Sequence, residues 1–206
     1  MKNLIVIALF LIGSLASAQD QYTKGMQKAL QLWGEGKNTE ASNLFERIAM
    51  AELDNWLPNY YVAQVNTIAA FGEQDKDKHA QQLAKAQEAI DIAKAISPDN
   101  VEIMVQQAMI HTAWVASDGA SYGMTLSPKI TALYAKAGTM DPANPRVVLS
   151  KAEWDMGSAA YFKQDTGPFC KDIEGSLELF DNFKPESPFH PNWGKERAEQ
   201  VLASCK

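Results

Sequence analysis

The sequence predicts an all-α protein in which helix pairs repeat along the chain. Ala, Gln, Glu, Lys and Leu dominate, β-branched residues are sparse, and no stretch of useful length alternates between apolar and polar residues. The segment AKAISPDN, which ends at Asn100, returns as AGTMDPAN, which ends at Asn144, 44 residues later. Self-similarity at a fixed period is the signature of stacked repeats, so we expect a solenoid-like array.

The first residues have the layout of a secretory signal peptide, predicted to cover residues 1–18. Lys2 supplies a positive charge, residues 4–12 form an apolar run too short to span a bilayer, and a small-x-small site ends at Ala18. Cleavage between Ala18 and Gln19 would leave one helical-repeat domain, residues 19–206, in the periplasm or outside the cell and without further membrane insertion. An uncleaved N-terminal membrane anchor is the alternative.

Net charge argues against one class of partner. The chain carries 25 acidic and 19 basic residues, a formal net charge of −6, and it has no basic cluster. Binding to a phosphate backbone requires concentrated positive charge. We therefore expect no nucleic-acid partner.

Each repeat unit is expected to contain two helices, and the second helix shows the clearest pattern. Small or apolar residues recur there at i, i+4 and i+7, a spacing that places them on one side of a helix. These stripes are Ala41, Phe45 and Ile48; Ala86, Ile90 and Ala93; and Ile130, Tyr134 and Ala137. In the second and third units the helix then stops before Pro98 or Pro142, and Asn100 or Asn144 can cap the next helix.

The boundaries follow in chain order. The four units span residues 21–57, 58–99, 100–144 and 145–191, and a capping segment covers 192–206. The predicted helices are 21–34 and 38–53, 58–71 and 77–97, 100–116 and 128–139, 145–163 and 168–184, and a terminal helix at 192–204. The glycine-rich turn after residue 33 separates the first pair, and the long connection at 117–127 is expected to be an irregular hairpin. The fourth unit departs most from the pattern, and its stripe is expected at Gly175 and Leu179.

This pattern resembles the tetratricopeptide repeat (TPR). The family places small, apolar, turn, small and aromatic residues in this order, and the first unit has Ala29, Leu32, Gly36, Ala41 and Phe45 at those positions. The third unit ends in the recognisable Asp141-Pro142-Ala143-Asn144-Pro145. The family unit has about 34 residues, so these units are longer, by insertions expected at Gly72–Lys78 and Ser117–Ser127. A period of 44 also falls in the HEAT and armadillo range. The resemblance implies a right-handed α-α superhelix of about four helix pairs plus a capping helix.

The last sixteen residues suit a cap, and they contain one of the two cysteines. Trp193, Ala198, Val201 and Leu202 give this segment an inner stripe, opposite a charged outer side. In an oxidising compartment we predict a disulfide between Cys170 and Cys205, which would staple the cap to the last helix pair. Two free thiols are the alternative.

The resemblance also implies a binding surface, because TPR-like arrays use the concave face formed by the first helix of each pair. Seven side chains in this register are candidate binding residues: Met26, Leu30, Trp33, Met109, Thr112, Glu153 and Met156. We expect an exported, non-enzymatic scaffold that binds a protein or peptide. Two alternatives stay open: a small-molecule or glycan binder that uses Trp33, Trp56 or Trp114, and an enzyme that uses the 117–127 loop.

The lack of recognisable catalytic motifs in the sequence supports the non-enzymatic interpretation. The residues around Lys37 do not match a P-loop, no Gly-x-Ser-x-Gly elbow occurs, and His79, His111 and His190 are not spaced as a metal-binding pair. We therefore predict no catalytic residues, no metal site and no cofactor.

Overall fold

A computed structural model describes residues 20–205, and all regular secondary structure in this range is helical. The predicted signal peptide and the cleavage site at Ala18 and Gln19 lie outside the described residues. Residues 20–34 form the N-terminal helix. It is followed by α2 (Asn38–Ala51), α3 (Trp56–Gly72), α4 (Lys76–Ile96), α5 (Val101–Ser117), α6 (Gly119–Met140), α7 (Pro145–Tyr161), α8 (Gly167–Asn182) and α9 (Lys195–Ser204).

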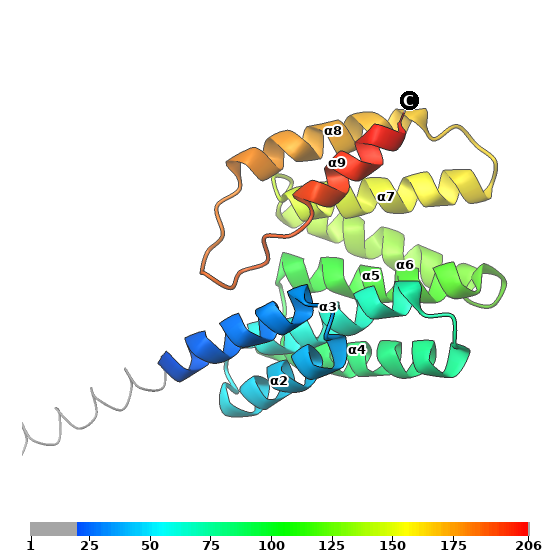
Figure 1. Ribbon diagram of the computed structural model, residues 1–206. Coiled ribbons are helices and arrows are strands. Elements are labelled where there is room, and N and C mark those ends of the chain that lie inside the picture. Colours follow the sequence, from blue (N-terminus) through cyan, green and yellow to red (C-terminus); the bar gives the residue numbers. More distant parts are fainter. Residues whose placement is uncertain (1–19, 206) are drawn as a thin grey trace, which may run out of the picture.

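The helices form consecutive antiparallel pairs stacked in one direction, as Figure 1 shows. The inner row contains the first helix of each pair, with α3 beside α5 and α5 beside α7. The second helices, α4, α6 and α8, each pack against the first helix of their own pair. This arrangement confirms the predicted all-α, TPR-like class. No helix within residues 20–205 is long and apolar enough to cross a bilayer.

Each first helix has an alanine at an equivalent position, and this small side chain lets the paired helices approach closely. Ala29, Ala63, Ala108 and Ala152 are at most 2% exposed, and each lies near the middle of a first helix. Phe45, Ile90 and Tyr134 of the second helices are also buried, as their stripes predict. Burying such aliphatic and aromatic side chains is the main driving force for stacking the pairs.

Asparagine caps the start of three of the inner helices. Oδ1 of Asn100 accepts hydrogen bonds from the backbone N–H groups of Glu102 and Ile103, at 2.9 and 3.4 Å. Oδ1 of Asn144 accepts from the N–H of Arg146 at 3.0 Å, and Asn55 caps α3 in the same way. Both predicted caps are confirmed, and they satisfy N–H groups that a helix end leaves without partners.

The prediction of an irregular hairpin at 117–127 is wrong, because α6 begins at Gly119 and runs to Met140 without a break. Asp118 starts this helix by accepting hydrogen bonds from the backbone N–H and the hydroxyl of Ser121, at 3.0 and 2.7 Å. Pro128 lies inside the helix on an exposed face. The extra length of the third unit is therefore about two additional helical turns. The enzyme alternative depended on a loop at 117–127, and the structure has a helix there instead.

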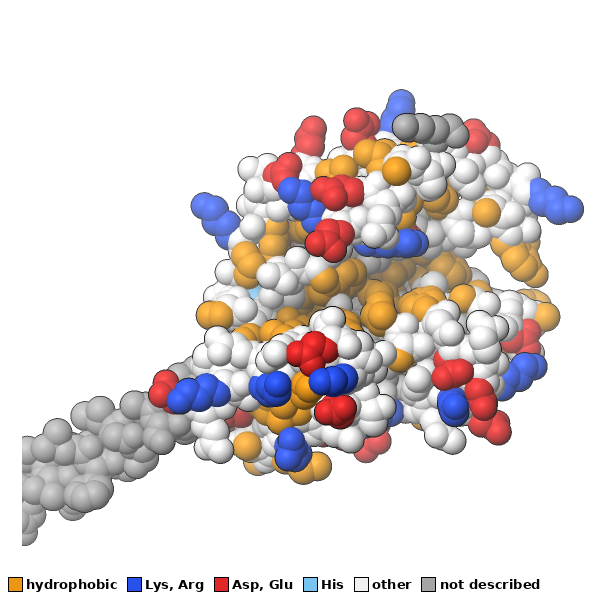
Figure 2. Space-filling view, viewed as in Figure 1, with side chains coloured by type: hydrophobic (Ala, Val, Ile, Leu, Met, Phe, Trp, Pro, Cys, Tyr) orange, Lys and Arg blue, Asp and Glu red, His pale blue; other side chains and the backbone are white. Residues whose placement is uncertain are grey.

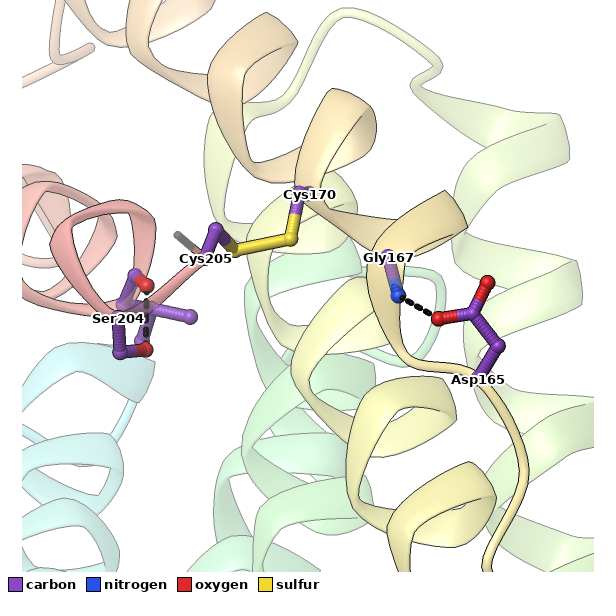
Figure 3. Close-up of a disulfide and its surroundings, with 6 residues drawn as sticks. Asp165, Gly167, Cys170, Ser204 and Cys205 are labelled. Atoms are coloured by element: carbon purple, nitrogen blue, oxygen red, sulfur yellow. Dashed lines mark hydrogen bonds between the residues drawn. A yellow bond between two sulfur atoms is a disulfide. The ribbon is translucent and has the colours of Figure 1, made fainter.

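The predicted disulfide is present in the structure and joins α8 to the end of α9 (Figure 3). The Cα atoms of Cys170 and Cys205 are 5.9 Å apart. Between these helices, residues 183–194 form an irregular segment, which we call the strap. Figure 1 shows the strap leaving α8, reaching toward the N-terminal helix and returning to α9. The bond therefore closes a covalent loop that contains the strap.

Gly194, at the end of the strap, should tolerate no side chain. Its φ of +115° is a backbone conformation that glycine adopts readily and other residues avoid, and an added Cβ would lie 2.6 Å from Cζ of Phe180. We expect Gly194→Ala to lower the free energy of unfolding by about 1–3 kcal/mol, measured by urea denaturation. Gly175→Ala is the matched control, because that glycine lies in α8 facing open space. The control should be stabilising by about 0.5–1 kcal/mol, and equal effects at the two positions would contradict this account.

Candidate functional site

The inner row of helices lines a hollow on one side of the molecule. Figure 2 shows hydrophobic side chains at the bottom of this hollow, between the part built by α7–α9 and the part built by α2–α4. We call this surface the groove. It corresponds to the concave face on which the sequence places its candidate binding residues, and its two ends differ in what covers them.

The strap fills the end of the groove at which the inner helices begin. Tyr61 of α3 donates a hydrogen bond from its hydroxyl to the carbonyl of Phe189 at 2.9 Å, and Trp193 donates from its indole to the hydroxyl of Tyr60 at 2.8 Å. The ring of Tyr22 meets Phe189 edge to face, with centroids 5.5 Å apart. The strap thus covers this end of the groove with the protein's own chain.

A buried ion pair lies beneath the strap. Arg146, at the start of α7, is fully buried and binds Glu102, at the start of α5, through Nε to Oε2 at 2.7 Å and Nη2 to Oε1 at 2.6 Å. Asn144 also donates to Glu102 at 2.7 Å. The strap completes the cluster, because the ring of Phe183 lies 4.2 Å from the guanidinium and Nε2 of His190 lies 3.8 Å from Glu102.

The surroundings of Glu102 favour its ionised form. Burial alone would raise the pKa of this carboxyl, but the facing His190, then Arg146 and Asn144, outweigh burial and hold the pKa below the ordinary value for a glutamate. The position of Glu102 in the first turn of α5 also suits a negative charge. The cluster therefore joins two neighbouring repeat units and the strap through one buried carboxylate.

The opposite end of the groove, where the inner helices finish, is open, and we call it the open half. Ile68 and Phe71 of α3, four and seven residues after Gln64, share its helix face and are 44% and 45% exposed. Met109 of α5 is half-buried, and it packs against the second core cluster, as Trp154 does. Gln64 provides a polar group here, and its buried Oε1 accepts no hydrogen bond from the described residues. An apolar floor with few polar groups is typical of small-ligand sites.

The candidate binding residues have different surroundings in the structure. Leu30 and Trp33 are half-buried against the first core cluster. Met26 is completely buried in that cluster, so we remove it from the proposed site. Thr112 bonds to the carbonyl of Ala108 at 2.9 Å, and Met156 packs in the third cluster beside residues of α8 and α9.

Glu153 forms an ion pair that the sequence did not indicate. Nε of Arg197, in α9, donates a hydrogen bond to Oε1 of Glu153 at 2.7 Å, and Nη2 lies 2.7 Å from the same oxygen. The side chains are 59% exposed for Arg197 and 28% for Glu153. Burial first, and then the charge of Glu153, raise the pKa of Tyr134, so this carboxylate lies close to the core of its repeat unit as well as to solvent.

The three tryptophans of the glycan alternative all pack against the first core cluster. Trp33 meets Tyr61, Trp56 meets Tyr60 and His190, and the contact between Tyr60 and Tyr61 joins these two tryptophans in one aromatic group. Trp114 meets His79 and Tyr122. The three histidines lie on different elements. His79 is buried against Trp114, His190 belongs to the strap, and His111 lies 3.3 Å from Gln107, which bonds to Gln87 of α4.

Fold and groove together define a TPR-like helical-repeat protein whose concave face is half closed by its own chain. Among solved structures, the chain is similar to the HusA haemophore from Porphyromonas gingivalis, with a TM-score of 0.78, 23% sequence identity, and coverage of 90% of this chain and 92% of that one. It also matches a thermophilic TPR protein of Thermus thermophilus, with a TM-score of 0.42, 12% identity, and coverage of 89% and 98%. At these identities the likeness concerns the fold. No family model and no curated protein matches the sequence.

Proposed function

We propose that this protein is an exported, non-enzymatic binding protein that holds a flat, largely apolar small molecule in the open half of the groove, with haem as the first ligand to test. The observation that carries the proposal is the division of the groove. The strap covers one half with the protein's own chain, and the remaining half has an apolar floor around Ile68, Phe71 and Met109. The similarity in fold to a haemophore supports the choice of haem.

Export is part of the proposal. The signal-peptide pattern ending at Ala18 and the disulfide between Cys170 and Cys205 both suit the periplasm or the exterior of the cell. A ligand-binding protein in these compartments needs a stable scaffold, and the disulfide holds α9 beside the groove.

A titration tests the proposed function directly. Haemin and iron-free protoporphyrin should each quench tryptophan fluorescence with saturation at one ligand per protein, and the absorption band of the porphyrin should shift. The matched variants are Gly157→Phe, which adds a ring on α7 at the open half, and Gly175→Phe, which adds the same ring on α8. Both glycines face open space and both are exposed. The first variant should weaken binding and the second should not. Absence of a saturable signal with the wild-type protein would refute the proposal.

A protein partner remains the second candidate function, because apolar side chains are exposed where α7 ends. Tyr161 and Phe162 are 70% and 68% exposed, and Tyr161 lies near Gly119 at the start of α6. Large exposed aromatic side chains are typical anchors at protein interfaces. Recovery of one specific partner with the wild-type protein, and its loss with Tyr161→Ser and Phe162→Ser together, would favour this candidate.

A further inference from the structure

The groove floor is apolar (Figure 2), and one ion pair, between Glu153 of α7 and Arg197 of α9, points to the chemistry of the ligand. Counting from the four buried alanines, Glu153 occupies the register position of Leu30, Gln64 and Met109 in the preceding helices. A carboxylate therefore stands in a row that is otherwise uncharged. Its partner, Arg197, comes from α9, which follows the strap.

The geometry of the pair leaves Arg197 able to bind a second anion. Nε donates to Oε1 of Glu153 at 2.7 Å and Nη2 lies 2.7 Å from the same oxygen, so the pair engages only one carboxylate oxygen, while most of the arginine side chain remains exposed. A guanidinium carries five N–H donors in a planar fork that suits carboxylates. An ion pair as exposed as this one contributes little to stability, so sharing its cation with a ligand costs little.

We propose that Arg197 binds a carboxylate of the ligand in the open half, and that Glu153 weakens this interaction by competing for the same guanidinium. This inference rests on the proposed function and adds to it that the ligand is an apolar molecule with at least one acidic group at its edge. The apolar body contacts the groove floor, and the acid reaches α9. Arg197 is thereby a specificity-determining residue that distinguishes acids from the corresponding esters.

Two substitutions with opposite expected effects test the inference. The probes are protoporphyrin IX and its dimethyl ester, which share the ring system and differ in the charge of the two acid groups. Arg197→Gln should weaken binding of the diacid about tenfold, the size typical of one charge-assisted hydrogen bond, and leave the diester unchanged. Glu153→Gln should tighten binding of the diacid about threefold, because it removes a competing and repelling charge.

Lys195→Gln is the matched control for the loss of one positive charge on α9. Lys195 pairs with Asp181 of α8 at 2.6 Å and takes no part in the Glu153 pair. This variant should bind both probes as the wild-type protein does. Circular dichroism during thermal unfolding should show that all three variants remain folded.

The possible outcomes separate this inference from the proposed function. If Arg197→Gln and Glu153→Gln weaken the diacid equally, the pair only shapes the groove and the inference is wrong. It is also wrong if the wild-type protein and Arg197→Gln bind acid and ester alike, although the proposed function then stands. A wild-type protein that binds neither porphyrin overturns both.

Discussion

The Arg146→Met variant is expected to have a free energy of unfolding about 3–5 kcal/mol lower than that of the wild-type protein. The loss arises because Glu102 keeps its charge beneath the strap but loses both hydrogen bonds from the guanidinium. Only Asn144 would still donate to this carboxylate at hydrogen-bonding distance. Urea denaturation followed by circular dichroism measures the change.

A double-substitution cycle shows whether the effect belongs to the pair. The variant with both Glu102→Gln and Arg146→Met should be more stable than Arg146→Met alone, because it no longer buries an unpaired charge. Lys195→Gln, which breaks an exposed pair, should change stability little. A loss below about 1 kcal/mol for Arg146→Met would mean that the ion pair does not hold the units together.

The stabilising contribution of Glu102 should also depend on pH. Its pKa in the folded protein is held below the ordinary value for a glutamate, so the unfolded chain binds the proton more readily. The contribution is therefore complete above the pKa of the unfolded chain and is lost as the pH falls through the folded pKa. The difference in stability between the wild-type protein and Glu102→Gln should shrink as acidification protonates this carboxyl. A difference that grows instead would contradict the charge network.

Removal of the disulfide is expected to have the second-largest effect. Replacing Cys170 and Cys205 together with serine opens a loop with a sequence separation of 35 residues, and the chain-entropy model assigns such a closure about 3–4 kcal/mol. Comparing urea denaturation of the wild-type protein under oxidising and reducing conditions should give a loss of the same size. The serine variant should not respond to reductant, and it serves as the control.

Loss of the disulfide should also affect the groove, because α9 carries Arg197. The same loop contains the strap, so its contacts with Tyr60 and Tyr61 then depend on non-covalent packing alone. Faster amide hydrogen exchange in residues 183–194 would report this loosening. Unchanged exchange in the strap and unchanged stability would show that the cap is held without the bond.

The helix pairs were predictable because their signals are local. Small residues at helical spacing, prolines at 98 and 142, and asparagine caps at 100 and 144 act within a few residues of the structure that they specify. The error at 117–127 has a local cause as well. Gly119 and Pro128 are poor helix formers, but the Asp118 cap and the packing of the helix against α5 outweigh their propensities. The stripe in α8 was also misplaced, since Ile173 and Ser176 are buried and Gly175 is exposed.

The strap and its ion pairs could not be predicted in the same way, because they join residues far apart in the sequence. Tyr61 and Phe189 are separated by 128 residues, and no local pattern indicates that the strap returns to α3. One signal was available. Glu102 and Arg146 are 44 residues apart, one repeat period, so opposite charges stand at equivalent positions of neighbouring units. Arg197 and Glu153 have the same separation, but only the structure shows that α9 folds back onto α7.

Methyl NMR of the methionines tests the central claim most directly, namely that the open half is the ligand site while the strap stays in place. On titration of ¹³C-methyl-methionine protein with iron-free protoporphyrin, the methyl signal of Met109 should shift strongly, since it would lie against the porphyrin ring. Met50 and Met140, exposed on α2 and at the end of α6, should not shift, and Met26, buried in the same core cluster as Phe189 of the strap, should shift little. If the methyl signals of Met50 or Met140 shift while that of Met109 does not, the ligand binds outside the open half. A large shift at Met26 would mean that the strap leaves its position.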